Sequence, residues 1–100
     1  MLTYEEILEK IEENRERIRK YGVKRIGVFG SFVSREQSSE SDIDILVEFE
    51  KGKKTFDNYM DLKFFLEDLF RRKVDLVIVE TIKPGLKPYI LRSVRYASGL

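Results

Sequence analysis

A strictly alternating run from Asp42 to Phe49 constrains the fold more than any other part of this sequence. Successive side chains of a strand point to opposite faces, so this run has two unlike faces. One face carries Ile43, Ile45, Val47 and Phe49, and the other carries Asp42, Asp44, Leu46 and Glu48. The segment is therefore expected to bury its apolar face in a core and to present two neighbouring carboxylates on the other.

The rest of the chain predicts a small α+β domain around that strand. A capping box of Thr3 and Glu6 begins a helix that Gly22 ends, and hydrophobic periodicity indicates the other elements. The predicted helices cover 4–21, 56–71 and 89–94, and the predicted strands cover 24–29, 42–49 and 73–79. Residues 1–100 are interpreted as one domain, a small mixed β-sheet with helices packed on it.

The predicted helix over 56–71 has more aromatic residues than one buried face can hold. Its large apolar side chains are predicted to belong to the core; they are Phe56, Leu62, Phe64, Phe65, Leu66, Leu69 and Phe70. Phe64 and Phe65 are adjacent, however, and cannot both face inward on one helix. The surplus indicates either a crowded core or an exposed surface that binds a partner.

The composition narrows the chemistry. The sequence contains no Cys and no His, so any metal site must be built from oxygen ligands, which favour hard cations such as magnesium. Nineteen basic and eighteen acidic residues give a net charge of +1, which argues against direct nucleic-acid binding. No apolar run approaches the roughly 20 residues of a membrane span, so no membrane association and a cytoplasmic location are expected.

A Gly-Ser step supplies a candidate phosphate site. Gly30-Ser31 directly follows the predicted strand over 24–29, and a glycine there lets the backbone turn sharply and approach a ligand closely. Backbone amides and the serine hydroxyl at such a turn can bind a phosphate. A phosphate there would lie close to a metal held by Asp42 and Asp44 if the two strands are neighbours.

Asp75 is the third candidate carboxylate, because it is a charged residue inside the apolar strand over 73–79. An isolated buried carboxylate is costly, so a partner or a function is expected. Beside Asp42 and Asp44 it would bind the metal or accept the proton of an attacking hydroxyl. A structural alternative is an ion pair with a cation from the run over 71–73.

Together these residues resemble the signature of the polymerase-β-type nucleotidyltransferase superfamily. Gly30-Ser31 is followed after ten residues by Asp42-Ile43-Asp44, and then by a strand aspartate, Asp75. The short chain, its single N-terminal helix and Lys87-Pro88 resemble the minimal nucleotidyltransferases (MNT), antitoxins encoded beside HEPN-domain toxins. The resemblance extends from about residue 3 to residue 95.

The resemblance implies a polymerase-β-like fold and a mechanism with two magnesium ions, held by Asp42, Asp44 and Asp75, with ATP as the substrate. Gly30 and Ser31 would hold the outer phosphates. It further implies that AMP is transferred to a tyrosine of a HEPN ribonuclease toxin, which neutralises the toxin. Complexes with that partner are expected from the same resemblance, and homo-oligomers stay open.

The chain departs from the family pattern after the Gly-Ser step. Relatives usually have Gly-Ser-aromatic-Ala-Arg-Gly-Glu, whereas Ser34 occupies the arginine position here and Arg35 the following glycine position. Arg35 is therefore the candidate to take over the arginine's contact with the phosphates. If it does not, catalysis would be weakened.

Two other functions stay open. Ser34 favours a non-catalytic antitoxin that binds and masks its HEPN partner, whereas the three carboxylates favour an enzyme, since masking gains nothing from them. Transfer to another acceptor, such as a small molecule, is less favoured, because 100 residues leave little room for a separate acceptor domain.

Overall fold

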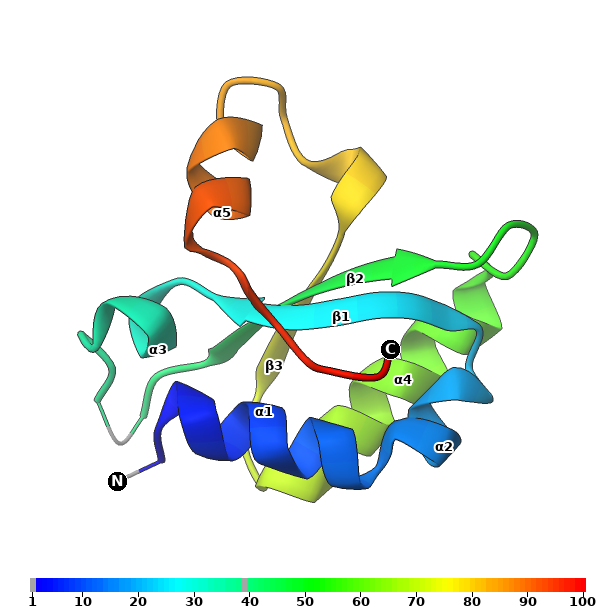
Figure 1. Ribbon diagram of the computed structural model, residues 1–100, viewed down its shortest axis with the longest axis horizontal. Coiled ribbons are helices and arrows are strands. Elements are labelled where there is room, and N and C mark those ends of the chain that lie inside the picture. Colours follow the sequence, from blue (N-terminus) through cyan, green and yellow to red (C-terminus); the bar gives the residue numbers. More distant parts are fainter. Residues whose placement is uncertain (1, 39) are drawn as a thin grey trace.

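The computed structural model describes residues 2–38 and 40–100 and confirms the predicted α+β architecture. Helix α1 (Tyr4–Glu13) and helix α2 (Arg15–Arg19) precede strand β1 (Val23–Phe29), short helix α3 (Ser31–Ser34) and strand β2 (Ile43–Phe49). The chain continues with helix α4 (Phe56–Phe70), strand β3 (Val74–Ile78) and 3-10 helix η1 (Val79–Thr81). It ends with helix α5 (Lys87–Ser93) and strand β4 (Arg95–Tyr96) (Figure 1).

The four strands form one mixed sheet in the order β3-β2-β1-β4. Strand β1 pairs antiparallel with both β2 and β4, and β2 pairs in parallel with β3. A parallel pair needs a long connection, and α4 supplies it. The register places Asp44 beside Asp75 across β2 and β3, and Phe29 beside Asp44 across β1 and β2.

The two faces of the sheet are covered differently. Helices α1, α2 and α4 lie on one face, and η1 and α5 stand above the other (Figure 1). The main core includes Ile43, Ile45, Val47 and Phe49, so the alternation of β2 is confirmed. Under α5, a smaller cluster is built on Phe29, Leu46 and Val94. The carboxylates of β2 and β3 lie beside this smaller cluster, on the less covered face.

The predicted helix over 4–21 is wrong as a continuous element, because it is interrupted at Asn14. Asn14 has φ −108° and ψ 19°, outside helical geometry, and its side-chain amide donates to the Lys10 carbonyl at 2.8 Å. Asparagine side chains compete for backbone groups in this way and favour breaks. The pattern could not reveal the interruption, because Ile18 keeps the apolar spacing after it and is fully buried.

Strand β4 was not predicted. It has only two residues, and it pairs with β1 through Gly27–Tyr96 and Val28–Arg95. The close pairing depends on Gly27, since a Cβ there would lie 2.6 Å from the Arg95 carbonyl oxygen. A two-residue strand leaves too little periodicity to detect.

The prediction that all the large apolar residues of α4 belong to the core is wrong for Phe56 and Phe64, and the half-buried Leu69 is in neither core cluster. Phe56 is 77% exposed and Phe64 is 58% exposed, whereas Leu62 and Leu66 are fully buried. Phe65 is partly buried and packs on Tyr21 with ring centroids 5.9 Å apart. One face of α4 therefore holds the core contacts and leaves the other aromatic residues outside.

Within residues 2–38 and 40–100, no helix is both long enough and apolar enough to cross a membrane.

We predict opposite outcomes for two identical substitutions. Phe32→Ala removes a fully buried ring that anchors α3 in the core and should lower the free energy of unfolding by about 3–5 kcal/mol. Phe56→Ala removes a ring that is 77% exposed and should change it by less than about 0.5 kcal/mol. Urea denaturation of both variants measures this, and equal losses would contradict the assigned core.

Candidate active site

Three carboxylates gather where β2 and β3 begin. Asp44 and Asp75 are direct neighbours across the parallel pair, and the Asp75 carboxylate is close enough to raise the pKa of Asp44. Asp42 lies two residues before Asp44, close enough for its negative charge to raise the pKa of Asp44. Asp42 and Asp75 are exposed, and Asp44 is partly buried. The structure thus brings together the three aspartates that the sequence singled out.

The end of β1 meets Asp44 at Gly30. This glycine has φ 76° and ψ −145°, a backbone conformation that L side chains rarely adopt. A Cβ at this position would lie 2.1 Å from Oδ2 of Asp44, so no other residue fits without moving the carboxylate. Gly30 is therefore required both for the turn and for the space that Asp44 occupies.

The pKa of Asp44 reports the crowding of negative charge. Burial raises it most, and the carboxylates of Asp75 and Asp42 raise it further, to about 6 from an ordinary value of 3.8. The backbone amide of Ser31 donates a hydrogen bond to the carboxylate and opposes the shift. The Ser31 amide therefore already serves an anionic oxygen, and the site contains more negative charge than the protein neutralises.

Helix α3 and Arg72 connect the Gly30–Ser31 turn with the segment that leads to Asp42. Phe32 of α3 is fully buried, and the Arg72 guanidinium lies over its ring, 5.3 Å from the centroid. The same guanidinium donates to the Ser41 carbonyl at 3.1 Å, just before Asp42, and to the Ser38 carbonyl at 3.4 Å. Arg72 was not among the predicted site residues, because contacts to carbonyls 31 and 34 residues away leave no local signal.

Arg35, the candidate phosphate ligand, lies against helix α1 in this structure. Its guanidinium is 2.8 Å from the Glu5 carboxylate and 5.1 Å from the centroid of the Tyr4 ring. This cation lowers the pKa of Glu5. Both partners are largely exposed, so the ion pair is open to exchange with another anion.

The structural alternative for Asp75 finds no support. In the described part of the chain, no ion pair joins Asp75 to Arg71, Arg72 or Lys73. Arg72 is instead occupied by the Ser38 and Ser41 carbonyls. Asp75 thus carries its charge on an exposed face beside Asp44, without a cation to neutralise it there.

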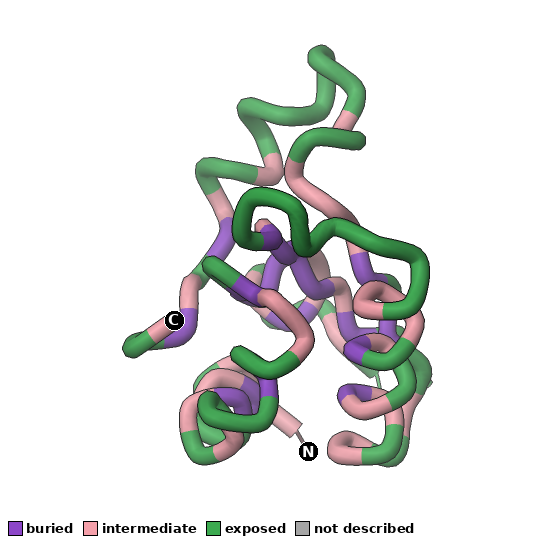
Figure 2. The backbone as a smooth tube through the Cα atoms, turned by 90° about the vertical axis from the view of Figure 1, so that its right-hand side faces the viewer, coloured by how far each residue is buried: buried purple, intermediate pink, exposed green. Residues whose placement is uncertain are grey.

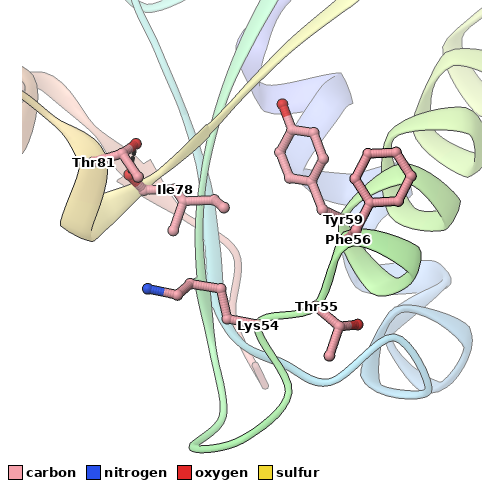
Figure 3. A pocket seen from close by; sticks show the side chains of 6 residues that line it. All are labelled: Lys54, Thr55, Phe56, Tyr59, Ile78 and Thr81. Atoms are coloured by element: carbon pink, nitrogen blue, oxygen red, sulfur yellow. Dashed lines mark hydrogen bonds between the residues drawn. The ribbon is translucent and has the colours of Figure 1, made fainter.

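A hollow lies at the other end of the sheet from the three aspartates. It has a volume of about 280 Å³ and is lined by Lys54, Thr55, Phe56, Tyr59, Ile78 and Thr81 (Figure 3). Tyr59 is fixed there by donating its hydroxyl to the Leu76 carbonyl at 2.6 Å. None of the predicted site residues lines this hollow, and it lacks acidic groups, so it is not where the candidate chemistry lies.

The three aspartates fit a magnesium-nucleotide site. Their oxygens are the hard ligands that Mg²⁺ prefers, and their mutual repulsion would be relieved by a cation. Within residues 2–38 and 40–100, no three or more acidic side chains are arranged so that they could hold a metal ion by themselves. Nucleotide sites do not need such an arrangement, since Mg²⁺ there takes one or two carboxylates and completes its shell with phosphates and water.

Comparison with known proteins places this geometry in a family. The nucleotidyltransferase domain model matches residues 6–97. The protein adenylyltransferase MntA of Thermococcus cleftensis is 40% identical over 97 residues, which covers 96% of this chain and 97% of that protein.

Two solved structures share the fold. One, described as a minimal nucleotidyltransferase, has a TM-score of 0.72 and 35% identity, and the match covers 88% of this chain and 93% of that one. The other is a tri-AMPylated HEPN toxin of Shewanella oneidensis in complex with an MNT antitoxin. It has a TM-score of 0.64 and 20% identity, over 93% of this chain and 73% of that chain, and it supports the fold alone.

These comparisons confirm the predicted family, fold class and enzyme class. The chain belongs to the nucleotidyltransferase domain family, as a minimal member related along almost its whole length to an archaeal protein adenylyltransferase.

Proposed function

We propose that this protein transfers AMP from ATP to a tyrosine hydroxyl of a HEPN-type toxin and so neutralises it. The observation that carries the proposal is the Asp44 carboxylate, which packs against Gly30 and is the register neighbour of Asp75. A related protein over nearly the full length is a protein adenylyltransferase, and a toxin bound to an antitoxin of this fold is AMPylated.

The proposed roles follow from the positions of the residues. Asp42 and Asp44 would hold Mg²⁺ with the triphosphate, and Asp75 would contribute to a second metal site. Bound magnesium would supply positive charge to the triphosphate and the leaving group. Gly30 lets the outer phosphates approach the backbone, and the Ser31 amide can donate to a phosphate oxygen as it does to Asp44.

The transfer is an in-line displacement at the α-phosphorus. A bond forms from the tyrosine oxygen to that phosphorus while the bond to the bridging oxygen breaks, and pyrophosphate leaves. Asp75 is exposed and faces the same side of the sheet as Asp44, so its carboxylate can accept the hydroxyl proton. Asp44, which is less exposed, would remain a ligand of the metal ion.

Arg35 contributes to phosphate binding by exchanging partners. In the structure it pairs with a single carboxylate, that of Glu5. A triphosphate presents more charge and more acceptor oxygens than one carboxylate, and a guanidinium matches phosphate geometry well. Binding of ATP therefore competes with Glu5 for the arginine.

Asp44→Asn should abolish transfer without unfolding the protein. Losing a direct metal ligand should cost more than the roughly 10–100-fold cost of losing an outer-shell partner. Glu48→Gln is the matched control, since Glu48 lies on the same strand and face but pairs with Lys24 and Arg25. Both are tested with ATP, magnesium and the HEPN-type partner by intact mass. Wild-type protein that leaves the partner's mass unchanged in a stable complex would support a masking antitoxin instead.

The same Asp44→Asn substitution should stabilise the fold at neutral pH. The folded-state pKa of Asp44 is raised, so the native protein binds the extra proton between 3.8 and about 6 and loses stability as the pH rises through that window. The full penalty is present above it, and its removal should add about 1–2 kcal/mol at pH 7 after allowance for partial exposure. Thermal unfolding at pH 7 and below pH 4 tests this, since the advantage should vanish at the lower pH.

Substitutions at the two ends of the Arg35–Glu5 pair should have opposite effects on nucleotide affinity. Arg35→Ala removes the proposed phosphate contact and should raise the KM for ATP several-fold, with a smaller change in kcat. Glu5→Gln releases the guanidinium and should lower that KM. Steady-state kinetics with varied ATP separates the two constants. A KM unchanged in both variants would remove Arg35 from the nucleotide site.

A further inference from the structure

Residues 79–93, from η1 through α5, form a lobe that has almost no interior of its own. No residue of α5 is buried, and a seven-residue helix is not stable by itself in water. The inner side packs Ile82 and Ile90 on the small cluster of Phe29, Leu46 and Val94. The outer side of the lobe is exposed along most of its length (Figure 2).

The outer side of the lobe is apolar and basic. Leu86 is 55% exposed and Tyr89 is 67% exposed, and residues three apart lie together at the start of a helix. Lys83, Lys87 and Arg92 are exposed around them, and no ion pair found in the described part of the chain involves these cations. From residue 81 to residue 100 the sequence has no Asp or Glu, although the whole chain is nearly neutral.

The lobe stands beside the carboxylates. Leu46, which lies under the lobe, is two residues from Asp44 on the same face of β2, a separation of about 7 Å along a strand. Phe29, in the same cluster, is the register neighbour of Asp44 across β1 and β2. A protein that covers the lobe could therefore extend to a nucleotide bound at the carboxylates.

The other exposed aromatic residues lie in the wrong place for this purpose. Phe64 belongs to α4, which covers the opposite face of the sheet (Figure 1). Phe56 lines the hollow at the far end of β3, beside Ile78, three residues beyond Asp75. Among the exposed large apolar residues, Leu86, Tyr89 and Leu91, which is 40% exposed, are the ones that lie on the lobe beside the candidate active site.

We propose that Leu86 and Tyr89, with the surrounding Lys83, Lys87 and Arg92, form the docking surface for the acceptor protein of the proposed transfer. The inference rests on that proposed function. The fitting partner surface is apolar at its centre and acidic at its rim, with the acceptor hydroxyl beside it. An apolar centre of large side chains within a charged rim is the usual build of a protein interface. A base-stacking site is less favoured, because Leu86 offers no flat face for a base.

Pro84 and Pro88 prepare the surface for binding. Proline fixes its own backbone angle, and Pro88 lies in the first turn of α5, where a missing amide costs nothing. A segment restrained in this way loses less conformational freedom when a partner binds, which favours affinity.

The test uses the full chain carrying Asp44→Asn, which binds but does not transfer, and the purified HEPN-type partner. Adding Leu86→Ala and Tyr89→Ala should weaken the complex about tenfold or more in titration calorimetry. Lys87→Glu should weaken it as well and reduce its dependence on salt. The matched control is Phe64→Ala, a comparably exposed residue on the opposite face, which should leave the affinity unchanged.

The outcomes separate the surface from the chemistry. Wild-type affinity in the Leu86→Ala, Tyr89→Ala variant would overturn the docking surface, even if wild-type protein transfers AMP. Weakened binding with no transfer by wild-type protein would keep the surface and overturn the proposed function. A loss of ATP affinity with unchanged partner affinity would assign the patch to the nucleotide. Conversion of a wild-type dimer to a monomer would assign it to a second copy of this chain. Either of the last two results overturns the proposal.

Discussion

The close approach of the Asp44 carboxylate to the Gly30 backbone is the contact on which the rest of the site depends. It joins the end of β1 to the beginning of β2, and it leaves no space for a side chain at residue 30. Because Asp44 is also the register neighbour of Asp75, the same contact fixes how β3 lies relative to the Gly-Ser turn. Three elements from different parts of the chain therefore meet at one carboxylate.

This arrangement is unfavourable for folding, and the rest of the domain offsets it. Three carboxylates lie on one side of the sheet, and the other two raise the pKa of Asp44. The protein therefore does not neutralise their charge fully. The opposite face compensates with a continuous apolar core against α1, α2 and α4. The alternation of β2 makes both possible, since every second residue belongs to the core and the others belong to the site.

The parts that were predictable from the sequence are those indicated by a short hydrophobic repeat or by residue types with a strong local preference. The alternation of β2, the glycine turn and the three aspartates all depend on near neighbours in the sequence. The break at Asn14 was not predictable, because the apolar spacing continues across it to Ile18. The periodicity of α4 identified a helix but could not say that Phe56 lies beyond the core, since that depends on where β3 ends.

Contacts between distant residues were hidden for a different reason. The roles of Arg72 and Arg35 follow from partners that lie thirty or more residues away, and a charged residue in a turn has no signature of its own. Arg72 lies over the Phe32 ring and donates a hydrogen bond to the Ser41 carbonyl just before Asp42. It therefore contacts both the segment after the Gly-Ser turn and the segment before the aspartates, although it is not part of the sequence signature. Arg35 takes a partner on α1 that the sequence alone could not select among many acidic residues.

The open face of the sheet then bears on how an acceptor is recognised. The site must stay open on its own face of the sheet, because a nucleotide and an acceptor both have to reach the carboxylates. The helices α1, α2 and α4 cover the opposite face of the sheet, so they cannot contribute to an acceptor site on this face. Recognition therefore falls to the segment that covers the remainder of the open face, the lobe over Phe29 and Leu46. A lobe with so little interior is free to use its side chains for binding, since few of them are needed to hold it in place.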